Sequence, residues 1–329
     1  MVAGMACAQS DSAAVKMKRL DDRLSAVEKV VSALPKIGGY INSAYTYDGC
    51  TDKNSFAVQQ IWLDFKGAPS ATLDYRALIN FASGLQVLDA YVRYTASPAF
   101  SIAAGQGKNP ILLENIMHPA RWGYINCSQI VRNYLHAGGR DIGVWVCGSL
   151  VPRDDYYRWN YMIGVYNGAG INTADDNHGK DVGLRIEYHP AKPLTLSLSA
   201  YEGNIGDRSV GKVNRYGASF RYDGPRFMLR TEYMTGIGAY GSALVNRTSQ
   251  GVYALAGLHV NPYIMPVLKY DYFDENINAD GFVHTIFGGG LHCWPTKFLS
   301  VEVNYGYNTF SSSLKKEYGR FDAAVSILF

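Results

Sequence analysis

Apolar and polar residues alternate with a period of two along almost the whole chain after Pro35. This pattern is typical of β-strands with one apolar face, because successive side chains of a strand point to opposite sides. Sixteen segments of about ten residues carry it, with turn-forming residues between them. They cover residues 38–47, 56–66, 72–82, 86–96, 99–106, 139–150, 157–166, 180–190, 193–202, 213–223, 226–236, 249–260, 262–272, 282–292, 296–306 and 319–329. The sequence therefore predicts an all-β fold with an even number of strands.

The last segment indicates how the sheet ends. In "YGRFDAAVSILF", Phe321, Val325 and Phe329 fall on one apolar face, and the chain stops on that face. Chain ends usually fray, because the last residues rarely bury enough surface to offset the entropy of ordering them. This end is expected to be held by pairing, as in a closed barrel whose last strand meets the first. For this segment alone, an edge strand of a soluble sandwich is the alternative.

The distribution of charge and turns indicates a membrane barrel. The longest stretch without Asp, Glu, Lys or Arg covers residues 248–268, and prolines interrupt it, so no transmembrane helix is predicted. A closed barrel is the one strand architecture that lipid tolerates. Tight connections such as Ser97-Pro98 alternate with long ones such as 167–179, and the 25 Tyr suit interfacial girdles. We therefore predict a 16-stranded antiparallel transmembrane β-barrel over residues 38–329, in the outer membrane of a Gram-negative bacterium.

Two short segments precede the predicted barrel. Residues 1–8 resemble the end of an export signal, with Ala6-Cys7-Ala8 as a small-x-small cleavage site, and a lipid anchor on Cys7 is the alternative. Residues 13–34 carry apolar residues at heptad spacing and end at Pro35. They predict a short helix that pairs with other copies as a periplasmic coiled coil. Docking of this helix on its own domain is the second interpretation.

Charge and cysteine content exclude several function classes. The net charge of +3 gives no strong attraction to polyanions, so nucleic acid is not an expected partner. Without Cys7, the chain has Cys50, Cys127, Cys147 and Cys293, with no CxxC motif and no histidines at zinc spacing. We therefore expect no metal and no cofactor, and the sequence does not decide whether these cysteines form disulfides.

The longest segment without a strand pattern, about residues 107–139, is rich in apolar residues. A loop of this length is usually functional or disordered, and the apolar content predicts that it folds into the barrel lumen. The expected pore-constriction residues are Lys108, Glu114, Arg121, Arg132 and Arg140. Basic residues at a narrow point favour anions, because they offset the cost of removing water from the anion.

The inward faces of the predicted strands carry charges of both signs. The arginines there, expected to line the pore, are Arg76, Arg93, Arg158, Arg185, Arg215, Arg221 and Arg230. The acidic residues on the same faces are Asp64, Asp74, Asp89, Glu187, Asp223, Glu232 and Glu302. Two interpretations stay open: the arginines bias the pore toward anions, or they pair with the carboxylates and hydrate the wall.

Several motifs resemble the phosphate-selective porin O/P family of outer-membrane channels. They are "IWLDFKG" at 61–67, "LDAYVRY" at 88–94, "GQGKNP" to "LLEN" at 105–115, "GRDIGV" at 139–144 and "VYNGAGINTADDNHGKDVGLR" at 165–185. The resemblance is strongest over residues 56–190, and the run from Asp89 to Glu114 is its most specific part. It implies a homotrimer of sixteen-stranded barrels in outer-membrane lipid that conducts anions through a basic constriction. The candidate loop lacks a cluster of lysines, so permeability to small anions or solutes in general is expected rather than phosphate selectivity.

Our first hypothesis is a passive diffusion channel, anion-leaning, in which Arg121 and Arg132 of the inward loop carry the preference. The second is a structural or adhesive barrel with a plugged lumen and a coiled-coil spacer. A barrel hydrolase is the third, and it would need His259, His284 or His292 beside a serine on the lipid-facing rim. No spacing in the sequence singles out such a site, so an enzyme is not expected.

Overall fold

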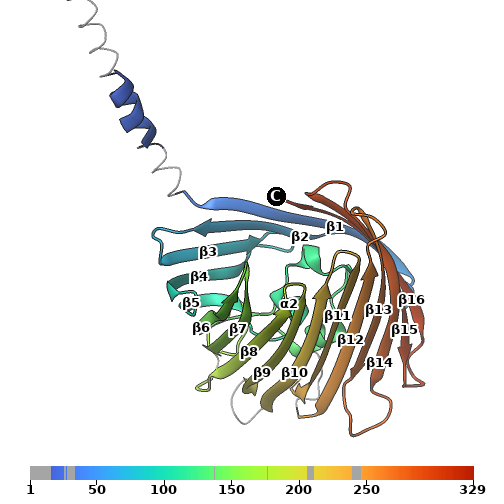
Figure 1. The fold of residues 1–329 in the computed structure, drawn as a ribbon. Coiled ribbons are helices and arrows are strands. Elements are labelled where there is room, and N and C mark those ends of the chain that lie inside the picture. The colour runs from blue at the N-terminus through green and yellow to red at the C-terminus, as the bar shows by residue number, and fades with distance from the viewer. Residues whose placement is uncertain are drawn as a thin grey trace, which may run out of the picture.

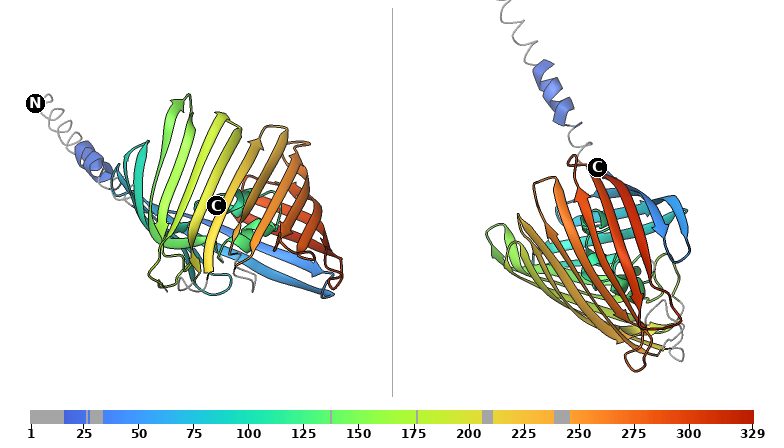
Figure 2. Two further views of the ribbon diagram at one scale, coloured as in Figure 1. Left: turned by 90° about the horizontal axis from the view of Figure 1, so that it is seen from below. Right: turned by 90° about the vertical axis from the view of Figure 1, so that its right-hand side faces the viewer.

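The fold is a closed barrel of sixteen antiparallel strands, each paired with its neighbours in sequence (Figures 1 and 2). The structure is a computed structural model that describes residues 16–25, 27, 34–136, 138–175, 177–205, 211–238 and 246–329. The strands are β1 Lys36–Asp48, β2 Lys53–Gly67, β3 Leu73–Asn80, β4 Gln86–Ser97, β5 Phe100–Lys108, β6 Arg140–Arg153, β7 Tyr156–Tyr166, β8 Asp181–Ala191, β9 Leu194–Ile205, β10 Gly211–Asp223, β11 Phe227–Ile237, β12 Thr248–Leu258, β13 Ile264–Asp274, β14 Val283–Cys293, β15 Leu299–Phe310 and β16 Tyr318–Leu328. The predicted fold class, strand number and strand order are confirmed.

The first and last strands close the ring. Tyr40 of β1 lies opposite Leu328 of β16. The amide of Gly39 donates to the carbonyl of Phe329 at 2.8 Å, and the amide of Phe329 donates to the carbonyl of Gly39 at 3.0 Å. Barrel closure therefore holds the apolar C-terminus, as the pattern of the last strand predicts.

The two ends of the barrel differ in the length of their connections. At one end the strands are joined by tight turns at residues 98–99, 154–155 and 192–193, and we call this the short-turn end. At the opposite end lie the longer connections 109–139 and 167–180, and we call this the long-loop end. The C-terminus and the start of β1 both lie at the short-turn end (Figure 1).

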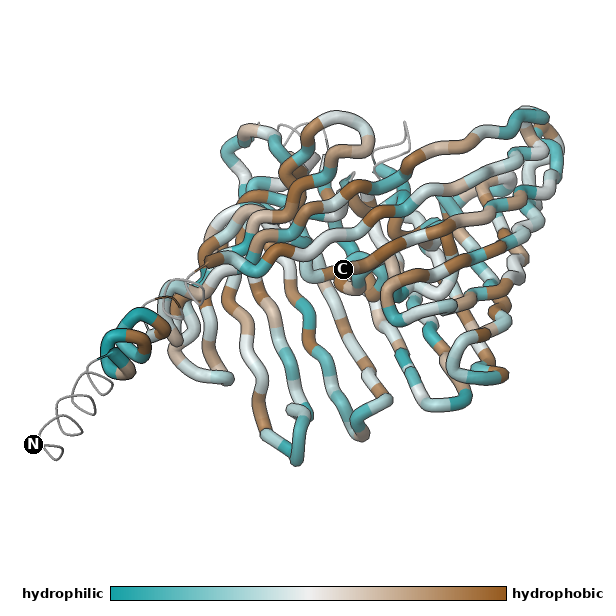
Figure 3. Tube along the Cα trace, turned by 90° about the horizontal axis from the view of Figure 1, so that it is seen from above, coloured by the Kyte–Doolittle hydropathy of each residue, from teal (hydrophilic) through white to brown (hydrophobic). Residues whose placement is uncertain are grey.

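The outer face and the lumen face of the strands differ in the side chains they carry. Apolar and polar positions alternate along them (Figure 3). On the outer face, Val144, Ile163 and Val165 are 46%, 44% and 47% exposed, as expected of side chains that meet lipid. On the lumen face, charged residues such as Arg215 and Asp271 are buried, because part of the chain fills the lumen beside them.

Before the barrel, residues 16–25 and 27 are helical and project from the short-turn end (Figure 1). Met17, Leu20 and Leu24 of the heptad pattern are mostly exposed. The rest of the predicted helix 13–34, apart from Leu34, and the predicted signal remnant 1–8 lie outside the described residues. The coiled coil stays a prediction. Within the described chain, no helix has both the length and the apolar character that a membrane-spanning helix needs.

The sequence does not decide whether the cysteines form disulfides. In the structure, four of them are free thiols: Cys50, Cys127, Cys147 and Cys293. In the part of the chain that the structure describes, no three side chains of His, Cys, Asp or Glu gather in a way that could hold a metal ion.

Candidate pore constriction

The chain between β5 and β6 folds into the barrel interior, where its short helices lie inside the ring of strands (Figures 1 and 2). We call residues 109–139 the inward loop. It contains α2 Leu113–Ile116, the 3-10 helix η1 Pro119–Arg121 and α3 Gln129–Tyr134. The sequence indicates an inward segment without strands but gives no sign of these helices, because they are too short for a helical period to show.

Apolar packing holds the inward loop against one side of the wall. Ile111, Ile130 and Tyr134 are fully buried and belong to one cluster with Phe273 of β13. The backbone of β12 comes very close to the inward loop at Gly251. A Cβ atom at this position would lie 2.4 Å from the Cγ2 of Ile130. Glycine is needed there because any side chain would push the loop away from the strand. A hydrophobic core therefore fills part of the lumen.

Hydrogen bonds to buried carboxylates of the barrel wall also hold the inward loop in place. The amide of Gln129, at the start of α3, donates to both carboxylate oxygens of Asp271 at 3.2 and 3.0 Å. The side-chain amide of Asn126 donates to Asp322 of β16 at 2.7 Å. These hydrogen bonds satisfy polar groups that the barrel shields from water. The inward loop is therefore held in position by hydrogen bonds as well as by apolar packing.

The inward loop also touches β1 and β2, further round the barrel wall. The ring of His118 packs edge-on against Tyr40 of β1 and Trp62 of β2, at centroid distances of 4.9 and 5.2 Å. Its Nδ1 accepts a hydrogen bond from the amide of Ala120 at 3.2 Å, which caps η1. Burial, with the positive charge of Lys108 nearby, lowers the pKa of His118 to about 4, so the ring is neutral at pH 7.

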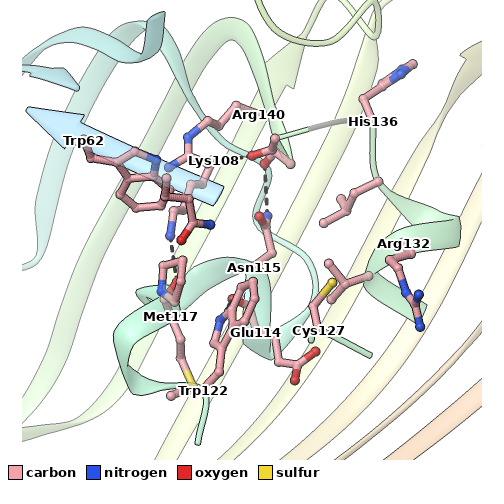
Figure 4. A pocket seen from close by; sticks show the side chains of 16 residues that line it. Trp62, Lys108, Glu114, Asn115, Met117, Trp122, Cys127, Arg132, His136 and Arg140 are labelled. Atoms are coloured by element: carbon pink, nitrogen blue, oxygen red, sulfur yellow. Dashed lines mark hydrogen bonds between the residues drawn. The ribbon is translucent and has the colours of Figure 1, made fainter. Parts of the chain in front are cut away.

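A cavity of about 610 Å³ lies between the inward loop and β2 (Figure 4). We call it the first cavity. Gln60 and Trp62 of β2 line one side of it. The rest includes Met117, Trp122, Val131, Arg132, Leu135, His136, Gly138, Gly139 and Arg140. The lining is thus a mixture of aromatic, thioether and polar side chains.

The predicted constriction residues all lie at this loop or at its base, but they do not act alike. The ammonium group of Lys108 donates to two backbone carbonyls of the loop at 3.3 and 2.9 Å. Arg140 donates from Nε to Asp89 at 2.7 Å. A buried carboxylate oxygen of Glu114 accepts from the amide of Ser128 at 2.7 Å. Each of these three charges is engaged in holding the loop in place.

Arg121 and Arg132 are different. Both are exposed, and within the described part of the chain neither guanidinium makes an ion pair. Arg132 lines the first cavity on the side opposite Lys108 and Arg140 (Figure 4). The structure therefore leaves two arginines of the inward loop available to a passing solute.

Two further cavities continue toward the short-turn end. The second cavity, of about 240 Å³, is lined by Trp62, His118 and Arg121 among others. The third cavity, of about 260 Å³, is lined by Arg121, His259 and Trp294 among others, beside the short turns. Trp62 lines both the first and the second cavity, and Arg121 lines both the second and the third. The three cavities thus follow one another along the inward loop.

The comparison with protein families decides what this barrel is. The sequence model described as phosphate-selective porin O and P matches residues 37–239, more than half of the chain. The chain belongs to this porin family. The resemblance and the outer-membrane localisation expected from the sequence are confirmed, and the porin is an outer-membrane channel for small solutes.

Solved structures similar to this porin are themselves outer-membrane proteins. OmpT of Vibrio cholerae has 11% identity and a TM-score of 0.66, with 90% of this chain and 97% of that chain covered. OmpF of Salmonella typhi, in complex with daunomycin, has 13% identity and a TM-score of 0.67, with 91% and 98% covered. The outer membrane channel DcaP of Acinetobacter baumannii has 13% identity and a TM-score of 0.60, with 90% and 97% covered. These likenesses concern the fold. No curated protein sequence matches the chain.

Most of the arginines expected to line the pore have partners on the wall. Arg76 pairs with Asp64 and Asp89, Arg93 with Asp74, Arg185 with Glu187, and Arg221 and Arg230 with Asp223. Arg215 is fully buried and donates to the carbonyls of Tyr134 and Gly238, and Arg158 lies half-buried on the lumen face of β7. For most of these positions, the interpretation in which the charges pair along the wall fits the geometry better.

The histidines considered for a hydrolase also have partners on the lumen side of the wall. His284 bonds to Asn308 at 2.9 Å, and His292 lies 3.1 Å from a carboxylate oxygen of Glu302. His259 lines the third cavity. A hydrolase of the kind considered would need one of these histidines on the lipid-facing rim, and all three instead face the barrel interior or its short-turn end.

Some residues of the site were not identified from the sequence as pore-lining. Trp62, Met117 and Trp294 line the cavities but carry no charge, whereas the constriction residues predicted from the sequence are all charged. A signal was present for Trp62, which falls on the same inward strand face as Asp64, two positions further along. For Trp294, just after β14, no sequence pattern indicates its position.

Proposed function

We propose that this porin is a passive, anion-leaning diffusion channel in which the inward loop sets the size limit. The observation that carries the proposal is the series of cavities lined by two arginines of the inward loop, which make no ion pair with any residue that the structure describes. Arg132 faces the first cavity, and Arg121 faces the second and third. A guanidinium in such a position offsets part of the dehydration cost of an anion and opposes the entry of a cation.

We further propose that the porin is a homotrimer with a periplasmic coiled coil. A trimer form is recorded for OmpT of Vibrio cholerae, a structural relative. The exposed Met17, Leu20 and Leu24 on the helix before the barrel form an apolar stripe that one helix alone cannot bury. Pairing with the same helix of other copies would cover it.

The test is a planar bilayer recording of the refolded full-length porin with a salt gradient across the membrane. We expect steps that come in groups of three and a reversal potential on the anion side. Arg121→Gln with Arg132→Gln should shift that potential toward zero. The matched control is Lys192→Gln, which removes the same charge from a turn at the short-turn end, where Lys192 pairs with Asp155. An unchanged potential in the double variant would contradict the role of the loop arginines.

The second candidate function is a structural barrel with a plugged lumen. It is favoured by one observation: the inward loop contacts opposite parts of the wall, through His118 on β1 and β2 and through the amide of Leu113, which donates to Glu232 of β11 at 2.7 Å. A protein of this kind would pass no steady current, although it would still migrate as a heat-modifiable barrel on a gel. Silent bilayers with folded protein would therefore favour this alternative over the channel.

A further inference from the structure

We propose that the cavities of this porin favour organic monocarboxylates with an apolar body over inorganic phosphate. The inference rests on the proposed channel function and names the class of solute that the same site takes. It follows from two properties of the lining. Few of its cations are free to meet an anion, and the surfaces facing those cations are aromatic or thioether.

Phosphate would find too few donors here. A strongly hydrated dianion is stabilised out of water only where several charged donors replace its water shell. In the first cavity, Lys108 donates to two backbone carbonyls and Arg140 is held by Asp89. Arg132 is the remaining arginine of this lining, and within the described chain it makes no ion pair. One guanidinium suits a single carboxylate better than a multiply charged oxyanion.

The wall of the first cavity suits the rest of an organic anion. Trp62 and Trp122 line it together with Met117. Aromatic faces and a thioether attract flat or apolar groups and offer almost nothing to a hydrated inorganic ion. Trp122 is held by a hydrogen bond from its Nε1 to the carbonyl of Glu114 at 2.8 Å. The apolar surface is therefore a fixed part of the constriction.

The third cavity repeats this combination with other residues. Trp294 stacks on His292 at a centroid distance of 3.9 Å and on His259 at 5.9 Å, so its ring is fixed in place. Met265 lies in the same lining, opposite the loop that carries Arg121. Arg230 also lines this cavity, but it pairs with Asp223 at 2.9 Å and donates to carbonyls of the loop. Arg121 is again the guanidinium that remains for a solute.

The two arrangements are independent, since they use different strands and different aromatic residues, yet both set one available arginine against an apolar wall. The second cavity lies between them, because it shares Trp62 with the first and Arg121 with the third. A monocarboxylate leaving Arg132 therefore meets a second guanidinium further along the loop, with aromatic surface beside both positions.

The experiment measures bi-ionic reversal potentials of the full-length porin, with chloride on one side and benzoate, acetate or phosphate on the other. We expect the permeability order benzoate, acetate, phosphate, although benzoate is the larger carboxylate. Arg132→Gln should lower benzoate permeability about fivefold, the factor expected for losing one charge contact in water. Trp294→Leu should lower the benzoate-to-acetate ratio about threefold, because an aromatic contact is lost. Lys192→Gln is the control and should leave the order as in the parent.

The possible outcomes separate this inference from the function on which it rests. A channel that prefers anions but passes phosphate as well as benzoate, or better, overturns the inference and leaves the channel function standing. A benzoate-to-acetate ratio unaffected by Trp294→Leu overturns the role of the third cavity. Folded protein that gives silent bilayers overturns the channel function, and the inference fails with it.

Discussion

Arg140 and Asp89 form a buried ion pair at the base of the inward loop, with Nε of the arginine 2.7 Å from the carboxylate. Both side chains are almost fully buried, and the same carboxylate also lies 2.8 Å from Arg76. One acid on β4 therefore holds two arginines that would otherwise repel each other. Arg140 and Arg76, which the sequence predicts to act in the pore, are thus held by carboxylates of the wall.

Removing this carboxylate should weaken the barrel more than removing an exposed one. In Asp89→Asn, Arg140 loses its counter-charge and Arg76 keeps only Asp64, and breaking a buried pair costs about 3 to 5 kcal/mol of unfolding free energy. The control is Asp74→Asn, which breaks the more exposed pair with Arg93 and should cost less than about 1 kcal/mol. The measurement is urea unfolding of the refolded barrel in detergent micelles. Equal losses in the two variants would contradict the structural role of Asp89.

The packing of the inward loop against β12 predicts a strong effect from a very small change. In Gly251→Ala the new methyl group would lie 2.4 Å from Ile130 and 2.8 Å from Phe273, so the loop or the strand must move. We expect a loss of about 1 to 3 kcal/mol, the usual cost of overpacking. Gly289→Ala is the matched control, because its new methyl group would meet its nearest neighbour at an ordinary 3.5 Å.

Both glycine variants can be compared by limited proteolysis of the folded protein and by single-channel recording. Gly251→Ala should expose the inward loop to protease and change the conductance, whereas Gly289→Ala should behave as the parent. Parent-like conductance and protection in Gly251→Ala would mean that the loop does not depend on its contact with β12.

Cys127 offers a chemical test of whether the inward loop lies in the ion path. Its thiol lines the first cavity, and burial, with Glu114 nearby, raises its pKa to about 11. The thiolate is the reactive form, so modification by a charged methanethiosulfonate reagent should be slow at pH 7 and about tenfold faster for each unit of higher pH. We expect conductance to fall as the label accumulates in a Cys50→Ala background, which removes the one thiol that is exposed among the four cysteines the structure describes.

The control for this experiment is Cys127→Ala in the same background, which should be insensitive to the reagent. Complete labelling of Cys127, verified by mass spectrometry, with no change in conductance would place the ion path away from the first cavity.

The strands could be predicted from the sequence because their signal is local. Each strand of about ten residues carries its own period-two pattern, and sixteen repetitions of the pattern outweigh an error in any one of them. The apolar content of residues 107–139 indicated in the same way that this segment is covered. Its three helices have four, three and six residues, which is too short for a helical period to appear in the sequence.

The sequence could not show which charged side chains form ion pairs and which stay available to a solute, because the partners are distant in the chain. Arg140 and Arg132 look alike in the sequence, but the first meets Asp89, 51 residues away, and the second faces a cavity. The same is true of Trp62, which becomes part of the constriction only when His118 of the inward loop packs against it. These contacts depend on how the inward loop is positioned against the strands. No local sequence pattern indicates that position.

The contact of His118 with β1 and β2 predicts a specific dependence of stability on pH. The pKa of this ring is lowered to about 4 in the folded barrel, below the usual value of 6.5. As the pH falls below about 6.5, the unfolded chain takes up a proton that the folded ring does not, so the folded state loses free energy relative to the unfolded state until about pH 4. A proton on Nδ1 would also remove the bond from the amide of Ala120.

We expect the urea midpoint of the refolded barrel to fall between pH 6.5 and pH 4, and His118→Phe to reduce that fall. Phenylalanine keeps a ring against Tyr40 and Trp62 but cannot titrate, so the comparison concerns the slope with pH and not the stability at pH 7. The control is His178→Phe, because His178 is exposed in the 167–180 loop. If His118→Phe keeps the slope of the parent, other groups cause the acid sensitivity, and His118 does not link protonation to the contact between the loop and the wall.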